Sequence, residues 1–255
     1  DNSIRSVVDY GANGSDLLDD YPAFLAAINA GVKKIIVPEG TYYLSQALNL
    51  SDGISIEGIS AERCILKSTA SSSDDALVFA NGSRTLLPNL STNLAENATT
   101  VSLVSTVSLK RGDIIMFVDT LNGSFNSSRT AYTNGFFAVV KDSVSALTSF
   151  ALNGYALAAL PSATTQLWKI TPTNTSVSNL TIDTKETHYS TGIRITHGNL
   201  NKINNVKVYG ADVNQILIER CFNASVSNSM FGKHAPDVAS LSYGVSAVSS
   251  QDVTI

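Results

Sequence analysis

Three short segments in the last third of the chain repeat one another residue for residue, and this repeat limits the possible folds more than any other feature. Each copy has an apolar residue, a polar residue and then an asparagine; the asparagines are Asn179, Asn205 and Asn228, which follow one another after 26 and 23 residues. A period of about two dozen residues is typical of solenoids, in which each repeat forms one coil that stacks on the next. The copies are residues 176–182, 202–208 and 225–231.

A second set of apolar segments alternates with these copies and indicates what each coil contains. Ile193, Ile216 and Val245 occupy equivalent positions in this set, so we expect them to stack in the interior. Three short strands in each period predict an all-β fold, a parallel β-solenoid. The repeated asparagines are expected to form a hydrogen-bonded ladder at a tight bend.

One helix is expected, near the N-terminus. The prediction places it over residues 19–30, because apolar residues recur there at helical spacing and Gly31 follows. Pro22 suits the first turn, and Asp19 and Asp20 provide carboxylates that cap a helix N-terminus.

The chain divides into three parts. Residues 1–82 hold the helix and the first coils, and residues 83–175 break the rhythm of the coils and predict an inserted small β subdomain. Residues 176–255 hold the later coils. Because the chain stops in mid-coil at Ile255, we expect further coils in a longer chain.

The composition excludes several classes of protein. Only 15% of the 255 residues are charged, the net charge is −4 and no basic block is present, which argues against nucleic acid as a partner. No run approaches the ~18 apolar residues of a membrane span, so no membrane insertion is expected. Cys64 and Cys221 lie far apart without metal-type spacing, so we expect two buried free thiols. The sequence contains no short metal-ligand motif and no phosphate-binding loop, so we expect no metal site and no cofactor.

Two segments near the N-terminus carry a family resemblance. Residues 8–14 (VDYGANG) lead to Asp19 and Asp20, and residues 35–44 (IIVPEGTYYL) follow the predicted helix. This order is similar to the N-terminal signature of the pectin-lyase-like superfamily, although residues 15–18 depart from its usual acidic motif. The resemblance implies a right-handed parallel β-helix that the helix caps at its N-terminal end.

Within that superfamily, residues 112–115 and 242–245 look most like those of bacteriophage tailspike and tail-appendage polysaccharide depolymerases. This resemblance implies a homotrimer on the virion tail, outside the cell, that binds and depolymerises a bacterial surface polysaccharide such as capsule, O-antigen or wall teichoic acid. Two alternatives stay open: a receptor-binding adhesin without catalysis, and a secreted pectinase-like glycosidase or lyase. The fold hosts several chemistries, so the chemistry must be argued from a site.

Candidate catalytic residues lie beside the long turns predicted at 184–191 and 233–243, since the turns of a solenoid vary more than its strands. A glycoside hydrolase needs two carboxyl groups that flank the scissile bond. Our first pair is Asp183 with Glu186, or either of them with Asp212; each of these acids is otherwise an ordinary solvated turn residue. The catalytic candidates are Asp183, Glu186, Glu219 and Asp237.

Hydrolysis is slightly favoured over β-elimination, because acids outnumber bases in these turns. A lyase would instead use a base such as His188, Arg194, Lys207 or Lys233. Nearby charged and aromatic side chains are expected to contact the sugar, although each is also explicable as ordinary surface. The substrate-binding candidates are His188, Arg194, Lys207, Tyr209, Asp212, His234 and Tyr243.

Overall fold

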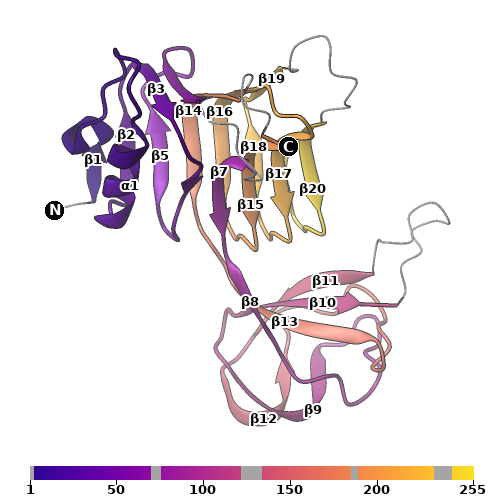
Figure 1. Cartoon of the computed structure of the whole chain (residues 1–255). Helices are drawn as coiled ribbons and strands as arrows, with labels where there is room; N and C mark the ends of the chain where they lie inside the picture. Colours follow the sequence, from indigo (N-terminus) through magenta and orange to yellow (C-terminus); the bar gives the residue numbers. More distant parts are fainter. Residues whose placement is uncertain (1–2, 70–75, 122–133, 185–188, 233–242) are drawn as a thin grey trace. The chain divides into compact units, whose positions relative to one another are not determined.

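The chain forms two compact units, one made of Asp1–Gly82 with Pro172–Ile255 and the other of Ser83–Thr171. The structure is a computed structural model, shown in Figure 1. The residues that it describes are 3–69, 76–121, 134–184, 189–232 and 243–255.

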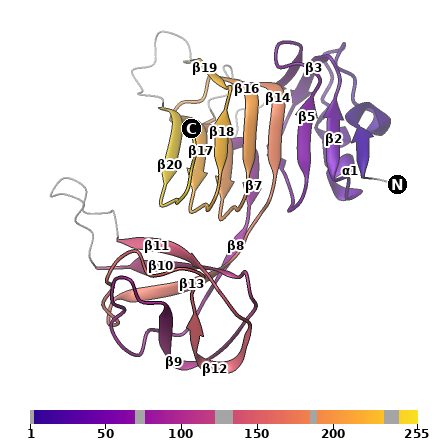
Figure 2. The ribbon, with the colours of Figure 1, turned by 180° about the vertical axis from the view of Figure 1, so that it is seen from behind.

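The first unit is the predicted parallel β-helix, with three faces whose strands pair in parallel from coil to coil (Figures 1 and 2). Face 1 consists of β1 (Ile4–Ser6), β2 (Lys34–Val37), β5 (Ser55–Gly58), the first halves of β14 (Ser176–Asp183) and β16 (Lys202–Tyr209), and β18 (Ser225–Ser227). Face 2 consists of β3 (Gly40–Leu44), β6 (Cys64–Ser68), the second halves of β14 and β16, and β19 (Met230–Gly232). Face 3 consists of β4 (Leu48–Asn49), β7 (Ala76–Asn81), β15 (Thr191–Thr196), β17 (Asn214–Glu219) and β20 (Tyr243–Val248).

Apolar side chains from equivalent positions stack in the interior, because successive residues of a strand point to opposite sides of its sheet. Ile193 pairs with Ile216, and Ile216 pairs with Val245, so the predicted stack on face 3 is confirmed. The register of the three repeated segments is also as predicted: the strand residues on both sides of the central asparagine pair with their equivalents in the next copy.

The bend between face 1 and face 2 falls on the repeated asparagines. Asn179, Asn205 and Asn228 have φ values of 56°, 52° and 51°, the left-handed region in which asparagine is tolerated better than most residues. Asn205 Nδ2 donates to Asn179 Oδ1 at 2.8 Å, as the ladder predicts, whereas Asn228 Nδ2 donates to Asn204 Oδ1 at 3.0 Å. The last rung of the ladder is therefore displaced by one residue, because Asn204 offers a second amide oxygen beside the bend. In the preceding coil Gly58 is the last residue of β5, and a Cβ on it would lie 2.1 Å from the Asn179 carbonyl oxygen.

The helix α1 (Tyr21–Asn29) lies at the N-terminal end of the β-helix (Figure 1) and is shorter at both ends than predicted. Its buried side chains, among them Phe24 and Ile28, belong to the same apolar core as the first strands of face 1. A helix here covers the apolar interior that the first coil would otherwise expose.

The predicted capping by Asp20 is wrong. Asp20 precedes the helix, but its side chain makes no bond to the first helical turn; its carboxylate instead accepts from the backbone N–H groups of Asn13 (2.7 Å) and Tyr43 (3.1 Å). Asp19 accepts from the Tyr21 N–H at 3.1 Å and takes the capping role. Asp20 is 4% exposed, and burial is the main cause that raises its pKa.

The second unit has its own sheets and its own core. A four-stranded antiparallel sheet has the order β11-β10-β13-β8 and a two-stranded sheet pairs β12 with β9; the rings of Phe117 and Phe136 stack at 4.7 Å in the core. The strands are β8 (Ser83–Leu86), β9 (Thr100–Leu109), β10 (Ile114–Asp119), β11 (Gly135–Val139), β12 (Val144–Ala151) and β13 (Thr165–Thr171).

The β-helix continues across this second unit without a missing coil. β14, the first strand after it, pairs directly with β5 and β6, which precede it. The connections leave and return at neighbouring points, since Gly82 N donates to Thr196 O and Thr173 N donates to the adjacent His197 O. The second unit therefore occupies one turn between face 3 and face 1.

Candidate functional site

One outward row of side chains on face 2 crosses the strands of four successive coils. Tyr43, Lys67, Asp183 and Tyr209 pair in that order from β3 to β16. Each is half-buried and follows a fully buried residue in its strand, so the four side chains face outward from the core. We call these four residues the face-2 row.

The ring of Tyr209 lies across the neighbouring coil, in the space left by Gly232. A Cβ on Gly232 would come within 2.1 Å of that ring. The Tyr209 hydroxyl donates to Met230 Sδ at 3.5 Å. The missing side chain thus lets an aromatic ring lie along the face rather than project from it.

Lys207 lies beside the row and is held by an ion pair. Its Nζ is 3.0 Å from Oε1 of Glu62, a residue in the turn between β5 and β6. The hydrogen bond from Lys207 is the main cause that lowers the pKa of the Glu62 carboxyl. Glu62 therefore stays ionised at neutral pH and serves as an anchor for Lys207, not as a proton donor.

The face-2 row combines the groups that hold a sugar. Aromatic rings pack against the apolar face of a pyranose. A carboxylate accepts hydrogen bonds from its hydroxyls and an ammonium group donates hydrogen bonds to them. Asp183 and Lys67 lie on adjacent strands, which are about 4.8 Å apart. Asp183 is the candidate catalytic carboxylate in this row.

Five candidates lie outside the described residues. Glu186 and His188 fall in 185–188, and Lys233, His234 and Asp237 fall in 233–242. Their roles stay predictions.

A separate polar cluster lies on face 3 and contains two other candidates. Arg194 Nη2 is 2.8 Å from Glu219 Oε2, and Arg220 Nη1 is 2.6 Å from Glu219 Oε1. Both carboxylate oxygens of Glu219 are thus engaged with guanidinium groups, and its side chain is only 15% exposed. Because this cluster lies on a different face, Asp183 and Glu219 do not form a pair that flanks one bond; a catalytic role for Glu219 stays a prediction.

The last two candidates lie between face 2 and face 3 and at the start of face 3. Asp212 is in the turn between β16 and β17, where its N–H donates to the Tyr189 carbonyl at 2.9 Å. Tyr243 begins β20, pairs with Asn214 and is 59% exposed. Tyr243 is therefore available to a ligand at the edge of face 3.

The described residues contain no group of three or more His, Cys, Asp or Glu side chains placed to hold a metal ion. They also contain no helix of the length and apolar character that crossing a membrane requires. Cys64 and Cys221 are buried and unbonded to each other, as predicted. Burial raises the pKa of the Cys221 thiol to about 11, so this thiol is unreactive at neutral pH.

Sequence reasoning missed Tyr43, Lys67 and Glu62. These residues belong to the first two coils, which lack the repeated asparagine and precede the second unit. The signal that was available is the alternation in the segments around Tyr43 and Lys67, which places both residues on the outward side of their strands.

Comparison with known proteins supports the fold. Residues 4–112 match the family described as rhamnogalacturonase A/epimerase, pectate lyase-like. No curated protein has a significantly similar sequence.

Several solved tailspikes share the fold. The tailspike gp61 of Pseudomonas phage phi297 aligns with a TM-score of 0.75 at 17% identity over 96% of this chain and 52% of its own. The tailspike gp49 of Pseudomonas phage LKA1 aligns with a TM-score of 0.75 at 20% identity over 96% of this chain and 46% of its own. The Gp54 tailspike of Acinetobacter baumannii bacteriophage AP22, solved in complex with A. baumannii capsular saccharide, aligns with a TM-score of 0.60 at 16% identity over 96% of this chain and 46% of its own. This chain thus spans about half the length of these tailspikes.

Proposed function

We propose that this chain, which has a pectate lyase-like β-helix fold, binds a bacterial surface polysaccharide along the face-2 row and depolymerises it. The observation that carries the proposal is the row itself, in which two tyrosines flank a lysine and an aspartate on four adjacent strands. The protein would act outside the cell as part of a phage tail, assembled as a homotrimer. Sedimentation equilibrium of the full-length protein tests the trimer.

The length of the row suits a polymer better than a single sugar. The four residues span three strand spacings of about 4.8 Å, or roughly 14 Å. An extended saccharide lying along the β-helix axis would contact several coils at once. Contacts from successive coils add up, which compensates for the weak binding of each sugar unit.

We slightly favour hydrolysis over β-elimination. In hydrolysis Asp183 would be one of the two catalytic carboxyl groups. An acid protonates the leaving oxygen, and a second carboxylate activates water or attacks the sugar. Glu186, Asp212 and Asp237 are the sequence candidates for the second carboxyl group. In β-elimination, a base removes the proton next to a uronate carboxylate and the glycosidic oxygen on the neighbouring carbon leaves. The new chain end then carries a carbon–carbon double bond that absorbs ultraviolet light.

The test is incubation of the full-length protein with purified capsule, O-antigen and wall teichoic acid, followed by chromatography of polymer size. We expect one polymer to shorten. The Asp183→Asn variant should cleave it about 10²–10⁴-fold more slowly. Asp142→Asn, which changes an exposed aspartate of the second unit, is the matched control and should retain full rate. Products that absorb ultraviolet light would show that the reaction is β-elimination and not hydrolysis.

A binding-only adhesin is the second candidate. It is favoured because two of the carboxylates are engaged in ion pairs: Glu62, near the row, pairs with Lys207, and Glu219, on face 3, pairs with two arginines. This function predicts that a polymer binds but keeps its length. In that case Asp183→Asn would weaken binding, and cleavage would be absent from both proteins.

A further inference from the structure

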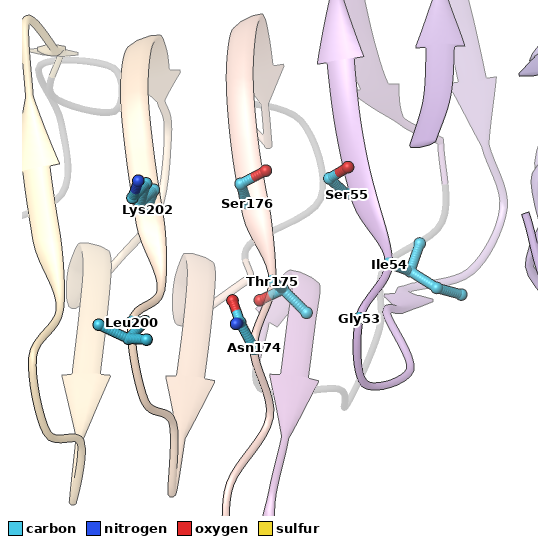
Figure 3. A pocket seen from close by; sticks show the side chains of 8 residues that line it. All are labelled: Gly53, Ile54, Ser55, Asn174, Thr175, Ser176, Leu200 and Lys202. Atoms are coloured by element: carbon cyan, nitrogen blue, oxygen red, sulfur yellow. The ribbon is translucent and has the colours of Figure 1, made fainter. Parts of the chain in front are cut away.

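A recess of about 390 Å³ lies on face 1, on a different side of the β-helix from the face-2 row (Figure 3). It is lined by the turns and strand starts of three successive coils, from β5 to β16. Its volume is at the lower end of the range for small-molecule sites. That volume accommodates one sugar unit.

The recess follows from side-chain length along one outward row of face 1. Lys34, Ser55, Ser176 and Lys202 pair in that order on four adjacent strands. Two short side chains between two long ones leave a depression. Figure 3 shows Ser55, Ser176 and Lys202 in a line along its upper edge, with Asn174 and Leu200 below.

Three polar groups at the recess are available to a ligand. Among the described residues, Lys202 has no ion-pair partner, whereas Lys34 is paired with Glu57 at 2.8 Å. The Ser176 hydroxyl and the Asn174 side-chain amide likewise have no hydrogen-bond partner in the part of the chain that the structure describes. A cation, a hydroxyl and an amide from two adjacent coils thus line the same recess.

The charge around the recess is positive. Lys33 Nζ lies 3.7 Å from the position that a Cβ on Gly53 would take, so a second ammonium group stands at the rim. The nearby carboxylate is that of Asp52, whose Oδ1 accepts from the Asn174 N–H at 2.8 Å. Lys33 and Lys202 against Asp52 leave one net positive charge, since Lys34 and Glu57 cancel.

An exposed leucine completes the recess. Leu200 is 52% exposed and has a φ of 60°, a left-handed conformation that is unfavourable for a non-glycine residue. The backbone holds it there through the Leu200 N–H, which donates to the Phe222 carbonyl at 3.3 Å. The apolar side chain therefore stands at the rim beside the polar groups.

We propose that this recess is a second saccharide site, which binds an anionic sugar unit and does not cleave it. Lys202 binds the carboxylate or phosphate of the sugar, Asn174 and Ser176 bind its hydroxyls, and Leu200 packs on the apolar face of its ring. The site holds an acidic polymer on face 1 independently of events at the face-2 row. It needs no cleavage activity.

The test is ligand-observed NMR titration of the full chain with methyl glucuronide, glucose 6-phosphate, methyl glucoside and inorganic phosphate. We expect the glucuronide or the sugar phosphate to bind at least about tenfold more tightly than the neutral glucoside and inorganic phosphate. Lys202→Glu should weaken that binding at least tenfold, and Lys202→Arg should retain it. Lys141→Glu, the same charge change at an exposed site of the second unit, should bind as the wild type does.

Ser176→Gln is a second test that leaves the charge unchanged, because it fills the recess and should also weaken binding. Equal binding by the wild type, Lys202→Glu and Ser176→Gln, or inorganic phosphate binding as tightly as the sugars, would overturn the proposal. Absence of binding by the wild type would overturn it too. The readout is binding and does not depend on cleavage. The Asp183→Asn protein should therefore bind these sugars as tightly as the wild type does. Failure of either proposal leaves the other standing.

Discussion

At the scale of single residues, the bends between faces 1 and 2 depend on asparagine. Asn179, Asn205 and Asn228 all adopt the left-handed backbone conformation, which costs most side chains about 1–2 kcal/mol. The asparagine amide also hydrogen-bonds to the next coil. One residue type thus supplies both the bend and a bond along the axis.

We predict that Asn205→Ala destabilises the protein by about 1–3 kcal/mol, because it loses the bond to Asn179 and strains the bend. Asn205→Gly keeps the left-handed conformation and should lose less. The midpoint of unfolding in urea measures both variants. Equal losses for the two would show that backbone conformation contributes nothing at this bend.

The buried carboxyl of Asp20 makes a second prediction at this scale. Burial raises its folded-state pKa, so the folded state favours the protonated form, and the stability that Asp20 contributes falls as the pH rises through the raised pKa. Asp20→Asn removes this dependence. The unfolding free energy of Asp20→Asn relative to wild type should therefore increase as the pH rises from below the ordinary aspartate pKa of about 3.9 through the raised pKa of Asp20.

Urea titrations at several pH values measure that difference. The exposed Asp142→Asn change should leave the slope of the wild type unaltered. A difference between Asp20→Asn and wild type that stays constant or decreases with pH would contradict this reading of Asp20.

At the scale of elements, the coils that repeat in sequence were predictable and the capping detail was not. The repeat 176–182 aligned with 202–208 and 225–231 because each coil must place apolar residues inward and an asparagine at the bend, and the strand registers follow that alignment. Asp20 was misassigned because a helix-capping pattern does not reveal that a buried backbone N–H of the next strand needs an acceptor.

The second unit makes a prediction at this scale. Because β14 pairs directly with β5 and β6, and Gly82 and Thr173 bond to neighbouring residues, replacement of Ser83–Thr171 by a short glycine–serine linker should leave the β-helix folded. Circular dichroism and limited proteolysis of the shortened protein measure this. Loss of cooperative unfolding would mean that the β-helix requires the second unit.

At the scale of the whole molecule, the face-2 row joins residues that are far apart in sequence. Asp183 and Tyr209 were predictable because they lie in repeated coils, whereas Tyr43 and Lys67 precede the second unit and become their neighbours only when β14 pairs with β6. Local sequence patterns cannot contain this information, since they do not show which earlier strand will pair with the first strand after an insertion. The site is therefore a product of stacking across the insertion.

The measurement that tests the central claim most directly is a crystal structure of the Asp183→Asn protein with an oligosaccharide of the polymer that it binds. The account predicts sugar units along face 2, with one ring against Tyr209 and hydroxyls within hydrogen-bond distance of Lys67. An oligosaccharide bound only elsewhere, with Tyr43, Lys67 and Tyr209 uncovered, would contradict the claim that the face-2 row is the polysaccharide site.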